Sequence, residues 1–145
     1  MKISTRGRYA LRLMIDLAEH ADCGTISLKE ISERQNISKK YLEQIIPFCV
    51  KAELVTSVRG AQGGYMLAKS PELITAGEIL RLTEGTLTPV ACAGETSPAC
   101  ARSVDCPALP VWRGLAETIN TYLDGITLQD ILDQQRALGL QSAAL

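Results

Sequence analysis

The first part of the chain carries apolar residues at helical spacing. Five of them between 7 and 21 repeat at i, i+3, i+4, i+7 and i+8, namely Ala10, Leu13, Met14, Leu17 and Ala18. A single apolar stripe of this kind predicts an amphipathic helix. Ser27 and Glu30 then form a capping box, which predicts a short helix over about 27–35. A tight turn and a capping Ser38 follow, and together they predict a third helix.

The pattern changes from helical to extended after this third helix. Pro47 lies inside its apolar pattern and has no N–H to donate, so we expect a kink or an early end there. Two β-prone runs at 54–58 and 65–68 flank the segment 59–64, whose three glycines permit the positive φ angles of a hairpin tip. Two helices, a turn, a helix and a hairpin follow one another as in a winged helix-turn-helix.

The second half alternates between helical and irregular segments. A capping box at 75–78 predicts a helix to about residue 83, and helical periodicity resumes over 111–123 and again after 127. Between them the chain has small residues, prolines and three cysteines without a periodic pattern, and such long connections are usually functional or disordered. We therefore predict a mainly α fold with a small β-hairpin wing, divided into a winged helix-turn-helix (1–84), a cysteine-containing loop (85–110), a long helix with a C-terminal helix (111–137) and a flexible tail (138–145).

Composition and charge narrow the class of protein. Aromatic residues make up only 4% of the 145, which argues against a β-sandwich or barrel. The net charge of −1 hides an asymmetry, because residues 1–70 carry 11 Lys and Arg against 7 Asp and Glu, whereas residues 71–145 carry 4 against 9. A basic front half joined to an acidic back half indicates that the front half binds a polyanion.

The predicted third helix and wing carry side chains suited to duplex DNA. A recognition helix enters the major groove by its N-terminal end, where the helix dipole also attracts phosphate. Here that end has a serine, two lysines and a tyrosine, and the next turn has a glutamate that can accept from cytosine and a glutamine that can pair with adenine. A basic, glycine-rich wing suits a narrow minor groove or phosphates. The predicted contacts with double-stranded DNA are Ser38, Lys39, Lys40, Tyr41, Glu43, Gln44, Arg59 and Gln62.

Three cysteines cluster in the irregular segment. Cys92, Cys100 and Cys106 form the pattern C-x7-C-x5-C, followed at once by Pro107. Thiolates are soft ligands that select iron–sulfur clusters, Zn²⁺ or Cu(I). Structural zinc loops favour shorter C-x2–4-C pairs, whereas a Cys-Pro step recurs in ferredoxin-type runs. The spacing therefore favours an iron–sulfur cluster, with zinc as the alternative.

The other cysteines and the single histidine are predicted to have structural roles. Cys49, between Phe48 and Val50, is expected to be a small buried hydrophobic residue, and Cys23 is expected to serve packing as well. His20 falls at the end of the first predicted helix, where an imidazole interacts favourably with the helix dipole.

The sequence carries none of the expected signals for secretion, membrane insertion or catalysis. Arg12 and Asp16 interrupt the stretch behind the basic N-terminus, and no window reaches the ~18–20 apolar residues that span a bilayer. We therefore expect a cytoplasmic protein with reduced thiols and no membrane contact. The chain has no nucleophile–base–acid constellation and no phosphate loop, so neither an enzyme nor a small-molecule substrate is expected.

Taken together, these motifs resemble the IscR-like family of winged helix-turn-helix transcription regulators. The resemblance covers about 1–135. It rests on MKISTRGRYA at 1–10, ISERQ at 31–35, YLEQ at 41–44, SVRG at 57–60, GGY at 63–65, the three-cysteine loop, and VW at 111–112.

The resemblance implies a homodimer in which the helix over 111–123 packs against its twin. It also implies a cluster held by the three loop cysteines, Cys92, Cys100 and Cys106. Of the two common types, we favour [2Fe–2S] over [4Fe–4S]. Members of the family sense iron–sulfur status, iron, redox conditions or nitric oxide, and they repress or activate promoters accordingly. A repressor is expected here. The recognition-helix and wing contacts of the family map onto Lys39, Lys40, Tyr41, Glu43, Gln44, Arg59 and Gln62.

The chain departs from the family pattern at the fourth cluster ligand. The best-known members place a histidine three residues past the last cysteine, where this chain has Leu109. Some relatives use an acid from the first helix of the partner, and the matching residue here is Arg8. The fourth ligand is therefore open among Glu95, Asp105, a partner-chain group, or an exogenous thiol or water. An incomplete all-cysteine set predicts a labile, exposed cluster, which suits a sensor.

Two functional hypotheses follow. In the first, an iron–sulfur cluster controls promoter binding. In the second, the protein is a cluster-free thiol-switch regulator in which the loop cysteines oxidise reversibly. The second needs thiols of low pKa, and only Arg102 supplies positive charge near them in the sequence.

Overall fold

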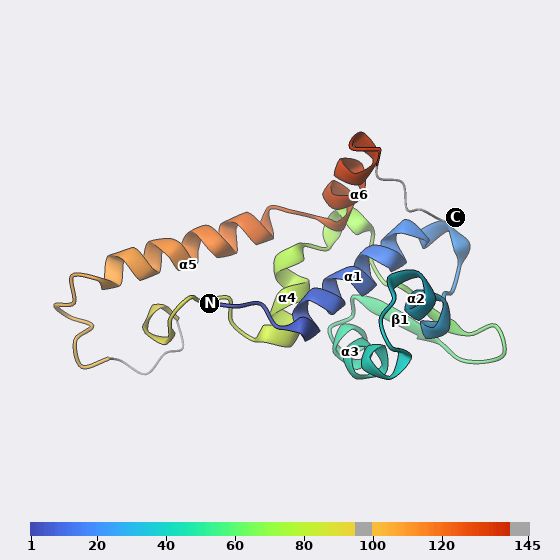
Figure 1. Ribbon diagram of the computed structural model, residues 1–145, viewed down its shortest axis with the longest axis horizontal. Coiled ribbons are helices and arrows are strands. Elements are labelled where there is room, and N and C mark those ends of the chain that lie inside the picture. The colour runs from blue at the N-terminus through green and yellow to red at the C-terminus, as the bar shows by residue number, and fades with distance from the viewer. Residues whose placement is uncertain (95–99, 140–145) are drawn as a thin grey trace.

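The computed structural model describes residues 1–94 and 100–139, which form a mainly helical fold with one antiparallel hairpin (Figure 1). The predicted fold class is confirmed. Glu95 and residues 140–145 lie outside the described residues. The helices and strands are α1 Thr5–Glu19, α2 Leu28–Gln35, α3 Lys39–Lys51, β1 Val55–Val58, β2 Gly64–Leu67, α4 Ala76–Glu84, α5 Leu109–Asp124 and α6 Leu128–Ala137, with short 3-10 turns at Ala21–Cys23, Pro71–Leu73 and Ala91–Ala93.

Local sequence determines where α2 and α3 begin. The Ser27 backbone N–H donates to the Glu30 carboxylate at 2.8 Å, and the Glu30 N–H donates to the Ser27 hydroxyl at 3.2 Å. The Ser27 backbone N–H and the Ser27 hydroxyl, which both donate to the Glu30 carboxylate, hold the pKa of Glu30 below its ordinary value. After α2, Asn36 takes a left-handed φ of 53°, which asparagine tolerates better than most residues. The chain then turns into Ser38, whose hydroxyl accepts from the Tyr41 N–H at 3.1 Å and caps α3.

Helix α3 runs through Pro47 and ends at Lys51, so the expected early end is wrong. Pro47 is exposed, whereas Cys49 in the following turn is fully buried and Val50 packs against the core. We attribute the continuation of α3 beyond Pro47 to this burial. Its favourable free energy offsets the cost of the backbone hydrogen bond that proline cannot donate.

The wing is tied to the segment that precedes α2. Strands β1 and β2 pair with Val58 opposite Gly64, and Gly60 at the tip has a φ of 112° that favours glycine. Ile26 forms an antiparallel bridge with Tyr65, whose N–H donates to the Ile26 carbonyl at 2.8 Å. A Cβ on Gly64 would lie 2.6 Å from that same carbonyl oxygen, so the close approach requires glycine.

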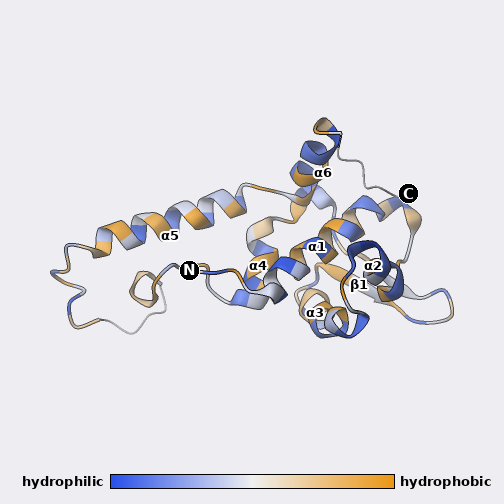
Figure 2. Ribbon diagram, viewed as in Figure 1, coloured by the Kyte–Doolittle hydropathy of each residue, from blue (hydrophilic) through white to orange (hydrophobic). Residues whose placement is uncertain are grey.

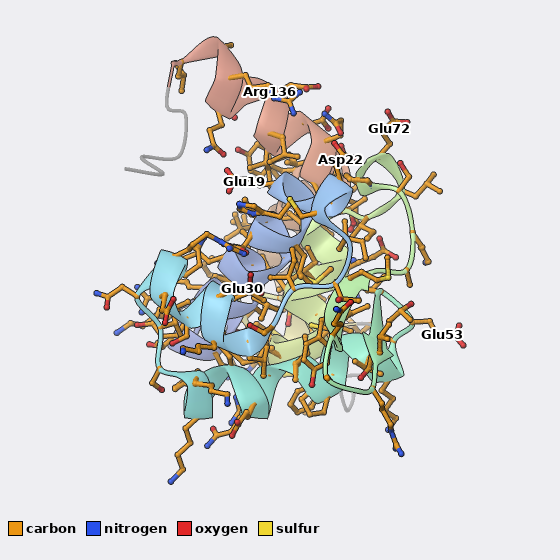
Figure 3. The ribbon with its side chains drawn as sticks, turned by 90° about the vertical axis from the view of Figure 1, so that its right-hand side faces the viewer. Glu19, Asp22, Glu30, Glu53, Glu72 and Arg136 are labelled. Carbon is orange, nitrogen blue, oxygen red and sulfur yellow. The ribbon has the colours of Figure 1, made fainter. Side chains whose placement is uncertain are left out.

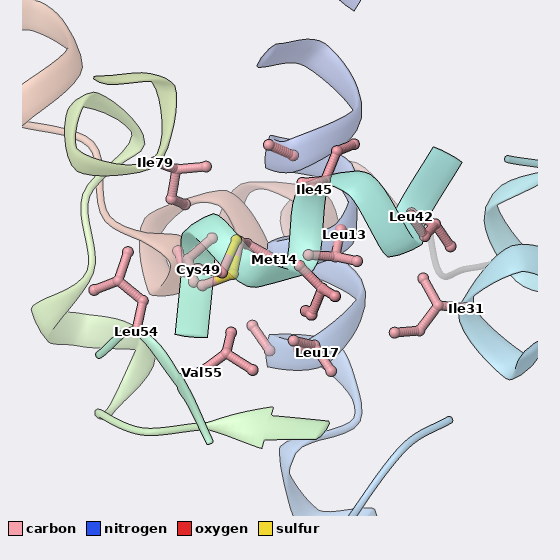
Figure 4. Packing of buried hydrophobic residues seen from close by; sticks show 14 of the residues in the cluster. Leu13, Met14, Leu17, Ile31, Leu42, Ile45, Cys49, Leu54, Val55 and Ile79 are labelled. Carbon is pink, nitrogen blue, oxygen red and sulfur yellow. The ribbon is translucent and has the colours of Figure 1, made fainter. Parts of the chain in front are cut away.

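The hydrophobic core is centred on α1. Leu13, Met14 and Leu17 of α1 face Ile45 and Cys49 of α3 (Figure 4). All five members of the apolar stripe predicted for the first helix are buried, so that stripe is confirmed. Burying each large aliphatic side chain contributes about 1.5–3 kcal/mol, so the packing of α1 is a main source of stability for the core that supports α3 and the hairpin.

Helix α6 returns to this same core. Its cap Thr127 forms an antiparallel bridge with Thr75, the cap of α4, and the Leu128 N–H donates to the Ile74 carbonyl at 2.9 Å. Leu128 and Leu132 of α6 are buried among the residues of α1–α4. Although the sequence pattern grouped α6 with the long helix, its apolar side chains pack into the core of the winged helix-turn-helix.

Helix α5 leaves the core and extends away from the other helices (Figure 1). It begins at Leu109, two residues earlier than expected, and Pro110 fits the first turn because its missing N–H has no helical partner there. Apolar turns recur along its length (Figure 2). Neither α5 nor any other helix in the described part of the chain has the length and hydropathy needed to cross a membrane.

Candidate nucleic-acid interface and cysteine loop

The first turns of α3 present the predicted polar side chains to solvent. Ser38, Lys39, Lys40, Glu43 and Gln44 are all exposed. The two lysines lie beside the free backbone N–H groups of the helix N-terminus, an arrangement that attracts phosphate. The glutamate and glutamine, which are predicted to reach base edges, follow one turn later on the same helix. The exposure of these five residues is compatible with their predicted contacts.

Tyr41 differs from these residues because its ring takes part in packing. It is partly buried, and its ring meets the ring of Tyr9 on α1 edge to face, with centroids 5.3 Å apart. The Arg12 guanidinium in turn lies 5.6 Å from the centroid of the Tyr9 ring. Tyr41 therefore joins the start of α3 to α1, a role that the sequence pattern did not reveal.

The wing tip exposes both of its predicted contact residues. Arg59 and Gln62 are exposed, while the backbone carbonyl of Gln62 accepts from the Thr25 hydroxyl at 2.8 Å. This bond fastens the tip to the segment before α2. The backbone of the wing is thus held in place while the Arg59 and Gln62 side chains face solvent.

A buried carboxylate that sequence reasoning missed organises the helix-turn-helix. Asp16 is fully buried, and no other charged residue among those described is. Its carboxylate accepts from Arg34 Nε at 3.0 Å, from Arg34 Nη2 at 2.6 Å and from Gln35 Nε2 at 3.0 Å. Arg12 donates from Nε to the Gln35 side-chain oxygen at 3.2 Å and from Nη2 to the Gln35 carbonyl. We call Arg12, Asp16, Arg34 and Gln35 the Asp16 clamp.

The position of Asp16 in the sequence offered a signal for this clamp. Asp16 follows Leu13 by three residues and therefore falls on the buried face of α1. A carboxylate on an apolar face is costly unless it is paired, so a basic partner from another element was to be expected. The hydrogen bonds to Arg34 raise the pKa of that guanidinium further above its ordinary value.

One group of potential metal ligands lies next to the clamp. Among the described residues, only Asp16, Glu19 and His20 bring three ligand atoms within 4.8 Å of one another. The Asp16 carboxylate is already used by Arg34, and the His20 Nδ1 atom lies 2.9 Å from the Asp16 carbonyl oxygen. His20 is the C-cap residue of α1, so its predicted place at the helix end is confirmed. Other acids, such as Glu53 and Glu72, project outward from separate parts of the surface (Figure 3).

The loop cysteines are accessible but are not gathered into one site in this structure. Cys92 and Cys100 are exposed, Cys106 is partly buried, and all five cysteines of the chain are free thiols. Their three sulfur atoms do not lie within 4.8 Å of one another. Leu109, at the position of the family histidine, is buried and is used in packing. Asp105, a candidate fourth ligand, is exposed.

The chemistry of this donor set fits a thiophilic metal group. Three reduced thiols lie in one segment, and small residues adjoin them, with Ala91 and Ala93 flanking Cys92 and Ala101 following Cys100. A hollow of about 920 Å³ opens beside this segment, between the end of α4 and one face of α5, and Ala93 forms part of its lining. None of the three cysteines lines this hollow, so the fit rests on the thiols themselves, which are the soft ligands that an iron–sulfur cluster needs.

The two remaining cysteines differ from each other. Cys49 is fully buried, and burial raises the pKa of its thiol to about 12, so the prediction of a small buried hydrophobic residue is confirmed. Cys23 is exposed in a 3-10 turn after α1, so the expectation that it serves packing is wrong. The turn ends at Gly24, which is also exposed, and the chain enters the core only at Ile26.

The C-terminal end of α5, which we call its base, is fixed to α4 by a bidentate ion pair. Arg81 donates from Nη1 and Nη2 to the two carboxylate oxygens of Asp124 at 2.7 and 2.8 Å, and also to the Asn120 side chain at 2.6 Å. The pair holds the pKa of Asp124 below its ordinary value. Gly77 permits the close approach, since a Cβ there would meet the Asp124 carboxylate. The direction in which α5 leaves the body is therefore determined by α4.

The outer face of α5 carries an apolar stripe. Val111 is 61% exposed, Trp112 37%, Leu115 43% and Tyr122 67%. Each follows the one before it in the sequence by one, three and seven residues in turn, and this spacing places all four on one side of a helix. Exposed apolar residues gathered in this way mark an interaction surface.

Comparison with known proteins gives this architecture a family. A family model described as Rrf2, iron-dependent transcriptional regulator, matches residues 3–134. The HTH-type transcriptional regulator CymR of Bacillus subtilis is 41% identical over 131 residues, which cover 90% of this chain and 89% of that protein. The HTH-type transcriptional regulator IscR of Aliivibrio salmonicida is 39% identical over 132 residues, which cover 91% of this chain and 77% of that protein.

The fold agrees with this relationship. The solved structure of CymR (YrzC), the global cysteine regulator of B. subtilis, matches with a TM-score of 0.78 at 38% identity, covering 92% of this chain and 98% of that one. The family consists of transcriptional regulators, and the expectation that the chain is not an enzyme is confirmed. With a capped recognition helix, a basic wing and a family match over almost its whole length, this chain belongs to the Rrf2 family of DNA-binding transcriptional regulators.

Proposed function

We propose that promoter binding by this regulator, acting as a repressor, is controlled by an iron–sulfur cluster held by Cys92, Cys100 and Cys106. The observation that carries the proposal is the position of three free thiols in the segment that joins the DNA-reading body to α5. The relatives named IscR and the description of the family as iron-dependent support it. When bound, such a cluster supplies a redox-active centre that oxidants, nitric oxide or iron shortage dismantle.

The ligand set favours a [2Fe–2S] cluster with one weak ligand. Three thiolates supply three of the four protein ligands that clusters commonly take. Leu109 has no donor atom and is buried, so the fourth ligand comes from Asp105, Glu95, a partner-chain group, or an exogenous thiol or water. An exchangeable fourth ligand gives a labile cluster, as a sensor requires.

The regulator acts as a homodimer through the apolar stripe of α5. A second copy that covers this stripe removes Val111, Leu115 and Tyr122 from water, which is the dominant favourable term in association. A dimer places two α3 helices on neighbouring major grooves, one helical turn of DNA apart.

The cysteine segment is connected to the DNA-reading body at its start. Glu84, the last residue of α4, accepts from the Ser4 N–H at 3.0 Å and also from the Ser4 hydroxyl. Ser4 is the N-cap of α1, the scaffold of the helix-turn-helix. A change in the order of the cysteine segment therefore acts on a helix cap of the DNA-reading body as well as on α5.

DNA is read by the residues predicted from the sequence. Lys39, Lys40 and Arg59 neutralise phosphates. Ser38 and Tyr41, in the first turn of α3, and Gln62, at the wing tip, contact the DNA next to these cations. Glu43 and Gln44 read base edges. Their exposure on α3 and on the wing supports this assignment.

Anaerobic purification tests the cluster directly. We expect coloured protein with about two iron and two acid-labile sulfide ions per chain. The variant with Cys92, Cys100 and Cys106 all replaced by Ala is expected to be colourless, and Cys23→Ala is the matched control that keeps the colour. Wild-type protein that stays colourless after reconstitution with iron and sulfide would contradict the proposal.

A cluster-free thiol switch is the second candidate. The thiols are accessible, their sulfur atoms are not gathered in this structure, and the relatives include proteins named CymR as well as IscR. In this case peroxide treatment of iron-free protein changes DNA affinity, and the triple Ala variant does not respond. Iron-free protein whose DNA affinity is insensitive to peroxide would exclude it.

A further inference from the structure

We infer that Asp16 is a positioning residue for sequence reading, because the Asp16 clamp determines how the recognition helix α3 sits on the DNA-reading body. The clamp connects the buried face of α1 to the last two residues of α2. None of its side chains is among the proposed DNA contacts. The inference rests on α3 being the recognition helix and is independent of the cluster.

The clamp holds the end of α2 directly before the turn into α3. Gln35 is the last residue of α2, and only Asn36 and Ile37 separate it from the cap Ser38. Its side chain donates to Asp16, while its side-chain oxygen and its backbone carbonyl accept from Arg12. With both its backbone and its side chain held, Gln35 determines the point from which the turn starts.

A second line of contacts runs from the clamp to the start of α3. The Arg12 guanidinium lies 5.6 Å from the centroid of the Tyr9 ring, and Tyr9 meets the ring of Tyr41 edge to face. Tyr41 lies in the first turn of α3, next to Lys39 and Lys40. The clamp therefore contacts the two ends of the α2–α3 turn, directly at Gln35 and through two rings at Tyr41.

This arrangement predicts that breaking the Asp16 clamp lowers the affinity for a specific DNA sequence more than it lowers the affinity for DNA in general. The phosphate-binding cations Lys39, Lys40 and Arg59 lie outside the clamp and keep their charge when it is broken. Phosphate contacts carry the non-specific affinity, whereas base contacts need α3 in its exact register in the groove. A displaced α3 therefore loses its contacts with base edges, while the contacts with phosphates remain.

Asp16→Asn tests the inference, with Leu132→Ala as the control. The control removes a buried side chain of α6 from the same core and so lowers stability without touching the clamp. Duplexes are selected from a random library by wild-type protein, and every variant is titrated with the selected duplex and with poly(dI–dC). Circular dichroism fixes a temperature at which all the proteins are folded.

For Asp16→Asn we expect at least a ~10-fold loss of affinity for the selected duplex, the size of about one base contact, and a change within about twofold for poly(dI–dC). Leu132→Ala is expected to keep the wild-type ratio of the two affinities. A library selection repeated with Asp16→Asn is expected to give a weaker sequence preference. An unchanged ratio in Asp16→Asn, or an equal loss on both duplexes, would overturn the inference.

Gln35→Leu keeps the inference testable if Asp16→Asn does not fold. This change removes the two side-chain bonds of Gln35, to Asp16 and to Arg12 Nε, and keeps the bond from Arg12 to the Gln35 backbone carbonyl. The ion pair between Asp16 and Arg34 also stays in place, so the buried carboxylate keeps its ion-pair partner. We expect the same fall in the ratio of selected to non-specific affinity. A Gln35→Leu protein with the wild-type ratio would overturn the inference as well.

Discussion

Cys49 and Cys92 carry the same thiol in opposite surroundings. Cys49 packs against Met14 and Ile45 of the core, and burial there raises its pKa to about 12, so the nucleophilic thiolate is absent at neutral pH. Cys92 stands in an exposed 3-10 turn with alanines on either side. Burial, rather than residue type, therefore separates the structural cysteine from the candidate ligands.

Alkylation of the native protein is expected to spare Cys49. Metal-free, reduced protein treated with iodoacetamide at pH 8 is expected to be modified at Cys23, Cys92 and Cys100, which are exposed. Cys49 is expected to react only after unfolding in urea. Peptide mass spectrometry of the alkylated protein measures each site. Rapid modification of Cys49 in folded protein would contradict the burial described here.

Arg59→Ala is expected to weaken DNA binding through the wing. The side chain is exposed at the tip, so its removal leaves the fold intact and deletes one cation that can neutralise phosphate. Log K plotted against log salt concentration is expected to become shallower by about 0.9 for each phosphate that is no longer neutralised. Lys69→Ala, an exposed lysine after β2, is the matched control. Unchanged affinity and an unchanged salt slope in Arg59→Ala would show that the wing does not touch DNA.

At the scale of the elements, α5 combines a polar base with an apolar outer face. Its base is fixed by the Arg81–Asp124 pair, while Leu115 and Tyr122 point to solvent. An isolated chain gains nothing from this exposure, whereas the second copy in the proposed dimer would cover it. The helix is therefore better explained as an interface between copies than as part of one folded body.

Leu115→Glu is expected to weaken the dimer. A charge in the middle of the apolar stripe has to be desolvated when the second copy docks, which costs several kcal/mol. Sedimentation analysis is expected to give a dimer for wild type and a monomer for the variant, and DNA affinity is expected to fall with it. Glu117→Ala changes a charge on the face of α5 that lines the hollow and serves as the control. A Leu115→Glu protein that stays dimeric at micromolar concentration would refute this interface.

Asp124→Asn is expected to destabilise the junction of α4 and α5 in a pH-dependent way. The folded-state pKa of Asp124 lies below its ordinary value of 3.8, so its contribution is present above that value and is lost as pH falls through the folded-state pKa. Because the pair is partly exposed, we expect roughly 0.5–1 kcal/mol at pH 7 and a vanishing difference in strong acid. Urea unfolding of both proteins at several pH values measures it. The control is Asp133→Asn, whose pair with Arg136 is exposed and 3.9 Å long. A difference that grows towards acid pH would contradict the assignment.

Most elements could be predicted from local signals because caps and apolar stripes act locally. The capping boxes at Ser27 and Thr75 were readable from four residues each, and both are present. The continuation of α3 past Pro47 could not be predicted from the sequence, because it depends on the burial of Cys49 by elements that are distant in the sequence. The partners of Asp16 and the return of α6 to the core are tertiary contacts for the same reason. The DNA contacts and the cysteine ligands follow from residue types and their spacing, and they stay predictions.

At the scale of the whole molecule, the uneven charge separates the predicted DNA-binding elements from the cysteine segment. The basic half contains α3 and the wing, and the acidic half contains the cysteine segment and α5. The two halves are not independent, because Glu84 of the acidic half holds Ser4 at the start of α1 and α6 packs into the core of the basic half. In the proposed regulation, a change at the cysteine segment would reach the DNA-reading helices through these contacts.

The central claim is that an iron–sulfur cluster in this segment controls promoter binding. The most direct test is an anaerobic titration of the selected duplex with one preparation of the protein, before and after the cluster is removed by a chelator. We expect the two affinities to differ at least ~10-fold, a coupling typical of allosteric regulators. The variant lacking Cys92, Cys100 and Cys106 is expected to give one affinity throughout. Equal affinities for the cluster-loaded and cluster-free wild-type protein would contradict the claim.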